Sequence, residues 1–221
     1  MDRTVKIGSS IEDLFDADQL TVTITISGIC NTKEECATAY NTNLAAVRSK
    51  LRQANVPDSA ISTRYFSLSA HTERLYRKKK GNGDYYYAKT EVQGYSYSGK
   101  VIAKTSDIEL STPIWLALSD CGDSVTFDMD FDLADENAAR ESLLARAVKS
   151  GEAKARILAK ASGAELGPIS SIEYDFENRR RGYYDGALYA PDFLGDDDQA
   201  PEFTPEPISI SCKVNCIWTL Q

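Results

Sequence analysis

The sequence predicts an α+β protein in which antiparallel sheets carry helices on one face. Three observations indicate this class. Apolar and polar residues alternate in several segments, most regularly at residues 20–27 and 125–133, as they do in half-buried strands. Two long segments, residues 33–54 and 136–162, place apolar residues three and four positions apart, which is typical of helices. An Asn82-Gly83 pair lies between two strand-like segments, and hairpins of this kind join antiparallel strands.

The first half of the chain is predicted to form a strand, a helix and a hairpin. The strand occupies residues 20–27, and Thr32 with Glu35 has the spacing of a capping box that begins a helix. We expect Pro57 to end this helix, because proline lacks the amide hydrogen that a helix interior needs. Strands at residues 63–72 and 85–105 form the hairpin. Four residues of the second strand lie on the same face: Tyr95, Tyr97, Val101 and Ala103.

A short helix and another alternating strand come next. Ser106 and Glu109 have the spacing of a second capping box. Pro113 predicts a late or irregular start for this helix, and Gly122 predicts its end. The alternating strand at residues 125–133 follows directly.

The longest predicted helix, residues 136–162, has a stripe rich in small residues, with Gly163 as the residue that ends it. Small side chains would let this helix lie close to a sheet. A strand at residues 169–176, a segment without periodicity at residues 178–207 and a strand at residues 208–220 complete the chain. The predicted stripe consists of Leu144, Val148, Gly151, Ala155, Leu158 and Ser162.

The predicted order of elements is β-α-β-β-α-β-α-β-β. Residues 20–70 and 125–176 each contain an alternating strand, a long helix, a connector and a further strand, so a duplicated β-α-β unit is one interpretation. We expect a single domain over residues 1–221, with two lobes at about residues 19–105 and 106–221 as the alternative. The pattern does not decide between one sheet and two lobes.

Composition and charge exclude several classes of protein. The formal net charge of −8 opposes binding of nucleic acid and of anionic membrane at long range. No apolar run approaches the roughly 20 residues that span a bilayer. Residues 1–6 lack the apolar segment of a secretory signal. We therefore expect a cytoplasmic protein for the chain as given, or a periplasmic or envelope protein if a signal was removed.

The five cysteines do not form a recognisable metal or disulfide pattern. Their number is odd, no pair has C-x-x-C spacing, and Cys212 and Cys216 on one strand would lie about 13 Å apart. We expect small buried apolar residues, with neither a disulfide framework nor a zinc site: Cys30, Cys36, Cys121, Cys212 and Cys216.

Other candidate chemistry is sparse. His71 is the sole histidine, and it has no nucleophile motif near it in sequence. Asp128, Asp130 and Asp132 fall on one strand face, where they could hold a hard cation or pair across subunits. A solvated face is the favoured interpretation, with Asp132 or Asp135 capping the next helix. We expect no catalytic residue, no cofactor and no metal site.

The candidate interface combines a basic, aromatic hairpin tip with an acidic segment. The tip resembles surfaces that stack bases and hold phosphates, but the net charge favours a tip that is solvated or meets a protein. In a homo-oligomer, opposite charges of the two segments could meet across subunits in a salt-sensitive contact. The interface residues are Arg77, Lys78, Lys79, Lys80, Tyr85, Tyr86, Tyr87, Asp196, Asp197 and Asp198.

Short motifs spread over residues 19–220 resemble the SIMPL-domain family, which includes YggE-like and periplasmic immunogenic proteins. These are the connector at residues 51–63, the strand opening Gln93-Gly94-Tyr95, the Asp120-Cys121-Gly122 turn, the alanine-rich helix from Ala139-Arg140 to Gly163, Leu166-Gly167-Pro168-Ile169, and the closing strand from Pro207-Ile208. The resemblance implies an α+β fold and a tendency to self-associate. It implies no catalytic residue, because the matching positions are core and turn positions.

Three hypotheses for function follow. The favoured one is a homo-oligomeric, non-enzymatic structural or interaction module without a nucleic-acid partner or a membrane span. The second is a module that binds a small molecule or peptide in a groove between the helices and a sheet edge. The third is an enzyme, which the missing nucleophile–base pair, metal cluster and phosphate loop disfavour.

Overall fold

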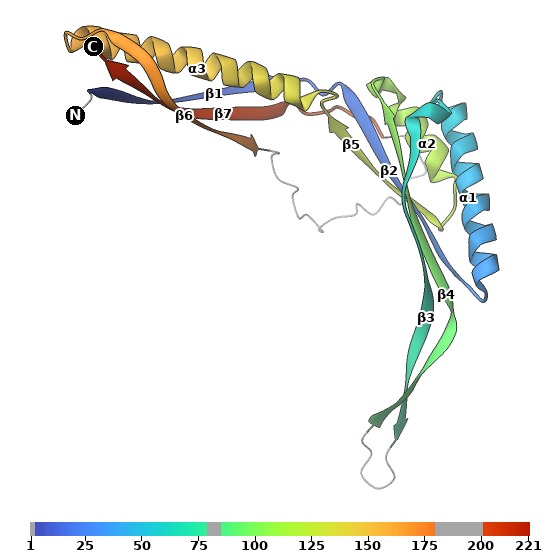
Figure 1. The fold of residues 1–221 in the computed structure, drawn as a ribbon. Helices are drawn as coiled ribbons and strands as arrows, with labels where there is room; N and C mark the ends of the chain where they lie inside the picture. The colour runs from blue at the N-terminus through green and yellow to red at the C-terminus, as the bar shows by residue number, and fades with distance from the viewer. Residues whose placement is uncertain (1–2, 79–84, 180–200) are drawn as a thin grey trace. The chain divides into compact units, whose positions relative to one another are not determined.

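A computed structural model describes residues 3–78, 85–179 and 201–221, which form two compact units. The α+β class with antiparallel sheets is confirmed (Figure 1). The predicted order lacked one element, the N-terminal strand β1 (Thr4–Phe15). It was missed because Gly8 and the buried Ser9 interrupt the apolar pattern.

Unit 2 comprises Asp18–Asp132 with Asp198–Thr204. Its sheet has the order β3-β4-β2-β5 and is antiparallel throughout. The strands are β2 (Gln19–Cys30), β3 (Ile61–Lys78), β4 (Tyr85–Thr105) and β5 (Val125–Asp132). The helices α1 (Lys33–Gln53) and α2 (Ser111–Ser119) cover one face, and two short 3-10 helices span Asp58–Ala60 and Ile108–Leu110.

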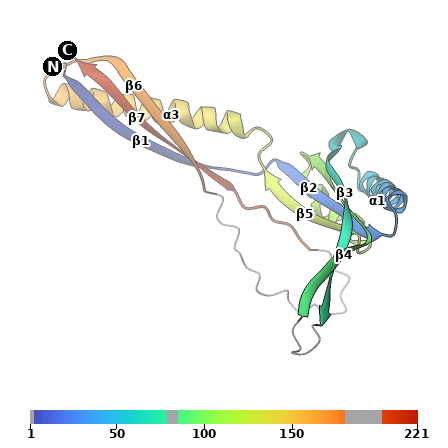
Figure 2. The same ribbon diagram turned by 60° about the horizontal axis from the view of Figure 1, so that its bottom comes forward.

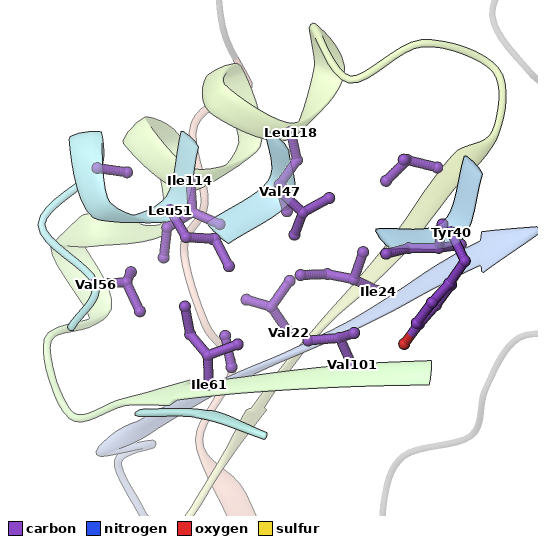
Figure 3. Close-up of a cluster of buried hydrophobic side chains, with 14 of the residues drawn as sticks. Val22, Ile24, Tyr40, Val47, Leu51, Val56, Ile61, Val101, Ile114 and Leu118 are labelled. Carbon is purple, nitrogen blue, oxygen red and sulfur yellow. The ribbon is translucent and has the colours of Figure 1, made fainter. Parts of the chain in front are cut away.

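The core of unit 2 lies between this sheet and the two helices (Figure 3). Alternate residues of β2 point into it and are fully buried, as the period-two pattern predicted. The predicted apolar face of β4 is also confirmed, since Tyr97, Val101 and Ala103 are buried and Tyr95 packs against the cluster. At 20–30 cal/mol for each Å² of apolar surface, such buried side chains contribute much of the stability of the unit.

Both ends of α1 are formed by local hydrogen bonds. The predicted capping box is confirmed: the Thr32 hydroxyl accepts from the Glu35 amide, and the Glu35 carboxylate accepts from the Thr32 amide. The helix ends before Pro57, which corrects the prediction. Asn55 has a left-handed φ of 63°, and the Val56 amide donates to the Leu51 carbonyl at 2.9 Å. The left-handed residue and this hydrogen bond belong to a Schellman motif. Backbone geometry therefore ends the helix, and Pro57 follows it.

The start of α2 differs from the predicted capping box. The side chain of Asp107 accepts from the Glu109 amide at 3.1 Å and caps the 3-10 turn, whereas Ser106 makes no such bond. A 3-10 turn before α2 places Pro113 in the first turn of the helix, where a missing amide hydrogen costs little. The irregular start predicted from Pro113 is therefore confirmed.

Unit 1 comprises Met1–Ala17, Leu133–Asp197 and Pro205–Gln221. Its three-stranded sheet has the order β1-β7-β6, with β6 at Leu166–Arg179 and β7 at Ile208–Leu220. The two ends of the chain pair along β1 and β7 (Figure 2). The helix α3 (Glu136–Ala161) packs on this sheet and ends at Gly163 in a Schellman motif, as predicted.

The buried stripe of α3 differs from the prediction. Leu144 and Val148 are only partly buried, and Leu158 is 50% exposed. Four-residue spacing of small side chains lets the helix backbone approach Trp218 of β7, since a Cβ at Gly151 would lie 3.4 Å from that ring. The stripe therefore follows the small residues, and its buried members are Leu143, Ala147, Gly151, Ala155 and Ala159.

Strand pairing does not follow the sequence division at residues 105 and 106. β5 pairs with β2 in unit 2, and β1 pairs with β7 in unit 1. The interpretation of a duplicated β-α-β unit is wrong, because β2 and β3 share one sheet whereas β5 and β6 belong to different sheets.

Candidate functional site

A two-stranded ribbon extends from the sheet of unit 2. β2 pairs with β4 only between residues 95 and 105. β3 and β4 continue to pair beyond that point, from Thr72 opposite Val92 to Lys78 opposite Tyr85. We call residues 72–78 and 85–92 the ribbon. At about 3.3 Å per residue, the eight residues from Ala70, level with the last residue of β2, to Lys78 extend roughly 26 Å, and Figures 1 and 2 both show the ribbon leaving the sheet.

The base of the ribbon is a position that requires glycine. A Cβ at Gly94 would lie 2.5 Å from the carbonyl oxygen of Cys30, so no larger residue fits without moving the backbone. The pairing register shifts here, between His71 and Thr72, and again between Leu75 and Tyr76. Such bulges increase strand twist, which turns the ribbon relative to the rest of the sheet.

The ribbon exposes both apolar and charged side chains. Val92 is 59% exposed and Tyr76 is 56% exposed. Glu73 lies directly opposite Glu91, and Glu91 forms an ion pair with Lys89. Apolar and charged side chains therefore lie close together on the ribbon. Protein interfaces have a similar composition, with aromatic contacts surrounded by a charged rim.

The exposed apolar surface continues onto the edge strand β3. Tyr65, Phe66 and Leu68 are 51%, 44% and 37% exposed. The ring of Phe66 also contacts the buried Tyr40 of α1, with centroids 4.7 Å apart. Aromatic packing against α1 therefore holds the strand from which the ribbon extends.

The backbone brings together five of the predicted interface positions at the far end of the ribbon. Arg77 lies opposite Tyr86, and Lys78 lies opposite Tyr85, while Tyr87 lies opposite Tyr76. The other predicted residues fall outside the described part of the chain, so their contact with the tip stays a prediction: Lys79, Lys80, Asp196, Asp197 and Asp198.

Sequence reasoning missed the length of the ribbon and its exposed member Val92. The predicted strand at residues 63–72 is in fact the 18-residue strand β3. A signal existed, because the predicted return strand of 21 residues needs a partner of similar length. Charged residues after Thr72 hid that partner, since they read as a turn.

The other candidate residues lie apart from the ribbon or on open strand faces. The exposed His71 pairs with Gly94, which has no side chain. Asp128 and Asp130 lie opposite Thr23 and Thr21 of β2. Asp135 caps α3, accepting from the Ala138 amide at 2.9 Å, which confirms one of the two predicted caps. Among the residues that the structure describes, no group of three His, Cys, Asp or Glu side chains could hold a metal ion.

Unit 1 contains an apolar groove between the edge strand β1 and α3. Its volume is about 410 Å³, and it is lined by two lysines and an apolar floor. Ile157 and Leu158 of α3 are 68% and 50% exposed there. The lining residues are Lys6, Ile7, Gly8, Lys154, Ile157 and Leu158.

None of the helices in the described ranges combines the length and the apolar character needed to cross a membrane.

Comparison with known proteins identifies a family. The model of the family described as "SIMPL: Protein of unknown function (DUF541)" matches residues 10–218. No curated protein matches the chain. Among solved structures, a protein described as unknown from Galdieria sulphuraria is similar at 8% identity, with 90% of this chain and 82% of that chain covered and a TM-score of 0.23.

Proposed function

We propose that this chain, which belongs to the SIMPL family, is a non-enzymatic module that self-associates through the ribbon of β3 and β4. The observation that carries the proposal is the pairing limit at Tyr95: beyond it, β4 has β3 as its one neighbour in the described sheet. A two-stranded hairpin is marginally stable by itself in water. Contacts with a partner would supply the stabilisation that a third strand gives elsewhere in the sheet.

Strand edges make the ribbon suited to a protein partner. Each edge of a strand pair presents amide and carbonyl groups that can add a further strand. Val92 and Tyr76 add exposed apolar surface beside those edges. Burial of such side chains is worth about 1.5–3 kcal/mol each, enough for several of them to hold an assembly together.

Charges would make the association selective. Glu73 and Glu91 face each other across the ribbon, and like charges directly opposite are unfavourable. Because Glu91 already pairs with Lys89, a partner that presents a cation beside Glu73 would relieve the repulsion that is left, whereas unselective pairing of strand edges would not. With the basic tip, this arrangement favours a heterologous, salt-sensitive contact between copies.

The non-enzymatic part of the proposal is supported by the placement of the sole histidine. His71 lies opposite Gly94 in the ladder, so its cross-strand neighbour offers no nucleophile. General acid–base chemistry requires a side chain within hydrogen-bond reach of the proton that it moves.

Solution mass tests the proposal. A trimmed variant replaces residues 73–91 by Asn-Gly, which joins Thr72 to the opposite Val92 in a two-residue turn. Light scattering on a size-exclusion column should give an oligomer for the full chain at low salt and a monomer for the trimmed variant. The trimmed variant should keep its melting temperature, because the side chains of β3 and β4 that the structure describes as buried lie outside the deleted segment.

Charge reversal refines this test. Lys78→Glu, Lys79→Glu and Lys80→Glu together should weaken the assembly, whereas reversal of the exposed Lys149, Lys154 and Lys160 of α3 is the control with the same change in net charge. A monomeric full chain at both low and high salt contradicts the proposal. Equal loss of mass in both triple variants contradicts the role of the tip.

The groove between β1 and α3 supports a second candidate function, binding of a small anionic amphiphile. Lys6 and Lys154 would hold its anionic group, and Ile157 and Leu158 would contact its apolar part. Titration calorimetry with dodecanoate should show binding that Lys6→Ala with Lys154→Ala weakens at least tenfold. Lys149→Ala, also on α3, should leave it unchanged, and no heat with the full chain contradicts this function.

A further inference from the structure

Two cysteines near the start of α1 converge on one residue of β4. Cys30, the last residue of β2, pairs across the sheet with Tyr95. Cys36 is fully buried in α1, and its thiol donates to the carbonyl oxygen of Tyr95 at 3.3 Å. A hydrogen bond with the Cys36 thiol raises the pKa of the Cys30 thiol. Cys30 also packs against the buried cluster that contains Cys36, and both cysteines are free.

The backbone around this pair is held in place. The Glu35 carboxylate accepts from the amides of Asn31 and Thr32 at 3.1 and 3.3 Å, which fixes the turn between the cysteines. On the other side, Gly94 approaches the Cys30 carbonyl so closely that a Cβ would lie 2.5 Å away. A disulfide demands a narrow range of Cα separations, so a pre-formed turn lowers the cost of making one.

The remaining cysteines lack such a neighbour in the described chain. Cys212 and Cys216 are buried on β7 and separated by four residues of strand, about 13 Å. The Cys121 thiol donates to the Ala117 carbonyl of the preceding helix α2 at 3.7 Å. Burial raises the pKa of all three thiols.

We propose that Cys30 and Cys36 form a reversible intramolecular disulfide that fastens the start of α1 to the end of β2. This inference is independent of the self-association proposed above. The oxidant is a low-molecular-weight disulfide such as oxidised glutathione. The half-buried Cys30 loses its proton and attacks one glutathione sulfur, which breaks that S–S bond and releases one glutathione thiolate. Cys36 then loses its proton and attacks the Cys30 sulfur, releasing the second. The two cysteines lose two protons and two electrons, and one glutathione disulfide becomes two thiols.

Trypsin maps this bond without ambiguity, because each of the five cysteines lies in a different tryptic peptide. Lys33 separates Cys30 from Cys36, so their peptides, residues 7–33 and 34–48, remain joined only through a disulfide. The native chain is incubated with oxidised glutathione at about pH 8, its free thiols are alkylated, and it is digested without reductant. The joined pair of peptides should be the main product, and dithiothreitol should separate it.

Thermal unfolding provides the second readout. Closing the seven-residue loop should raise the melting temperature of the oxidised chain by roughly 5 °C. Cys30→Ser should abolish both the joined peptides and this rise, whereas Cys121→Ser, the matched control, should retain both. If Cys30→Ser fails to fold, the peptide map of the unaltered chain decides alone. A glutathione adduct that stays on Cys30, random pairing among the five cysteines, or no pairing at all overturns the proposal.

Discussion

Replacing Gly99 by alanine should destabilise unit 2 by pushing on one ring. Gly99 lies opposite Phe66 of β3, and a Cβ at this position would lie 2.4 Å from the Tyr40 ring. Tyr40 is 7% exposed and contacts Phe66, so its ring has little room to move. Overpacking of this kind costs about 1–3 kcal/mol, and the better strand propensity of alanine offsets roughly 0.5–1 kcal/mol of it. We expect a net loss of about 1–2 kcal/mol in the free energy of unfolding.

A double-mutant cycle isolates the cause. Tyr40→Ala alone should cost about 3–5 kcal/mol, as large-to-small changes in cores do. In that background Gly99→Ala should cost nothing or stabilise, because its methyl group enters space that the ring has left. The coupling, measured by urea unfolding, should exceed about 1 kcal/mol. Gly122→Ala is the control, since its strain arises from a φ of +77° with no atom within 4 Å. Equal cost of Gly99→Ala in both backgrounds would refute the reasoning.

Three further perturbations test local features. Asn55→Ala should lower the free energy of unfolding by about 1 kcal/mol, because Asn55 has a φ of 63° that alanine adopts poorly; Asn55→Gly should not, and urea titration compares the two. Asp135→Ala should cost about 1 kcal/mol by removing the cap of α3, and unchanged stability would contradict that role. A hydrogen bond from Arg146 lowers the pKa of Asp13 below its ordinary 3.8. A lowered pKa stabilises the fold above the unfolded-state value and ceases to do so as pH falls through the folded value. The difference between the unaltered chain and Asp13→Asn should therefore shrink as the pH falls below the ordinary pKa of 3.8 in acid titrations, and a constant difference would contradict it.

The sequence predicted the structure correctly where interactions between residues close together in the chain determine it. The alternation in β2, the Thr32 cap and Gly163 each depend on neighbours within a few residues, and each is confirmed. Prediction failed where a distant partner decided. Gly8 and Ser9 belong to a strand because β7 lies beside them, more than 190 residues later in the chain. Leu158 reads as core by spacing, but Gly151 and Ala155 bring α3 close to the sheet and leave Leu158 at the rim.

The ribbon shows the same limit at the candidate site. In the ribbon, β3 continues through Glu73 and Arg74, charged residues that lie outside the predicted strand at residues 63–72. What makes them strands is the pairing of β3 with β4, which the core residues of both strands begin at the other end. Predicting the site therefore required the length of the hairpin. That length depends on the pairing of two segments and cannot be read from either segment alone.

Pairing of the two chain ends leads to a last prediction. β7 has β1 as one of its two neighbours in unit 1, so deleting residues 1–17 removes half of its ladder and the buried Ile7. α3 would then pack on two strands, which are marginal by themselves. Each unit contains one tryptophan, Trp115 in α2 and the buried Trp218 in β7.

In a Trp115→Phe background, the deletion should therefore shift the emission of Trp218 to longer wavelength before any denaturant is added. Hydrogen exchange should show the same separation, with β7 losing protection while β2 and β4 keep theirs, because the buried core of unit 2 is formed by residues within 20–125. If β7 stays protected without residues 1–17, the remaining pairing with β6 and the packing of α3 are sufficient for unit 1. Pairing of the chain ends would then be a consequence of the fold and no requirement for it.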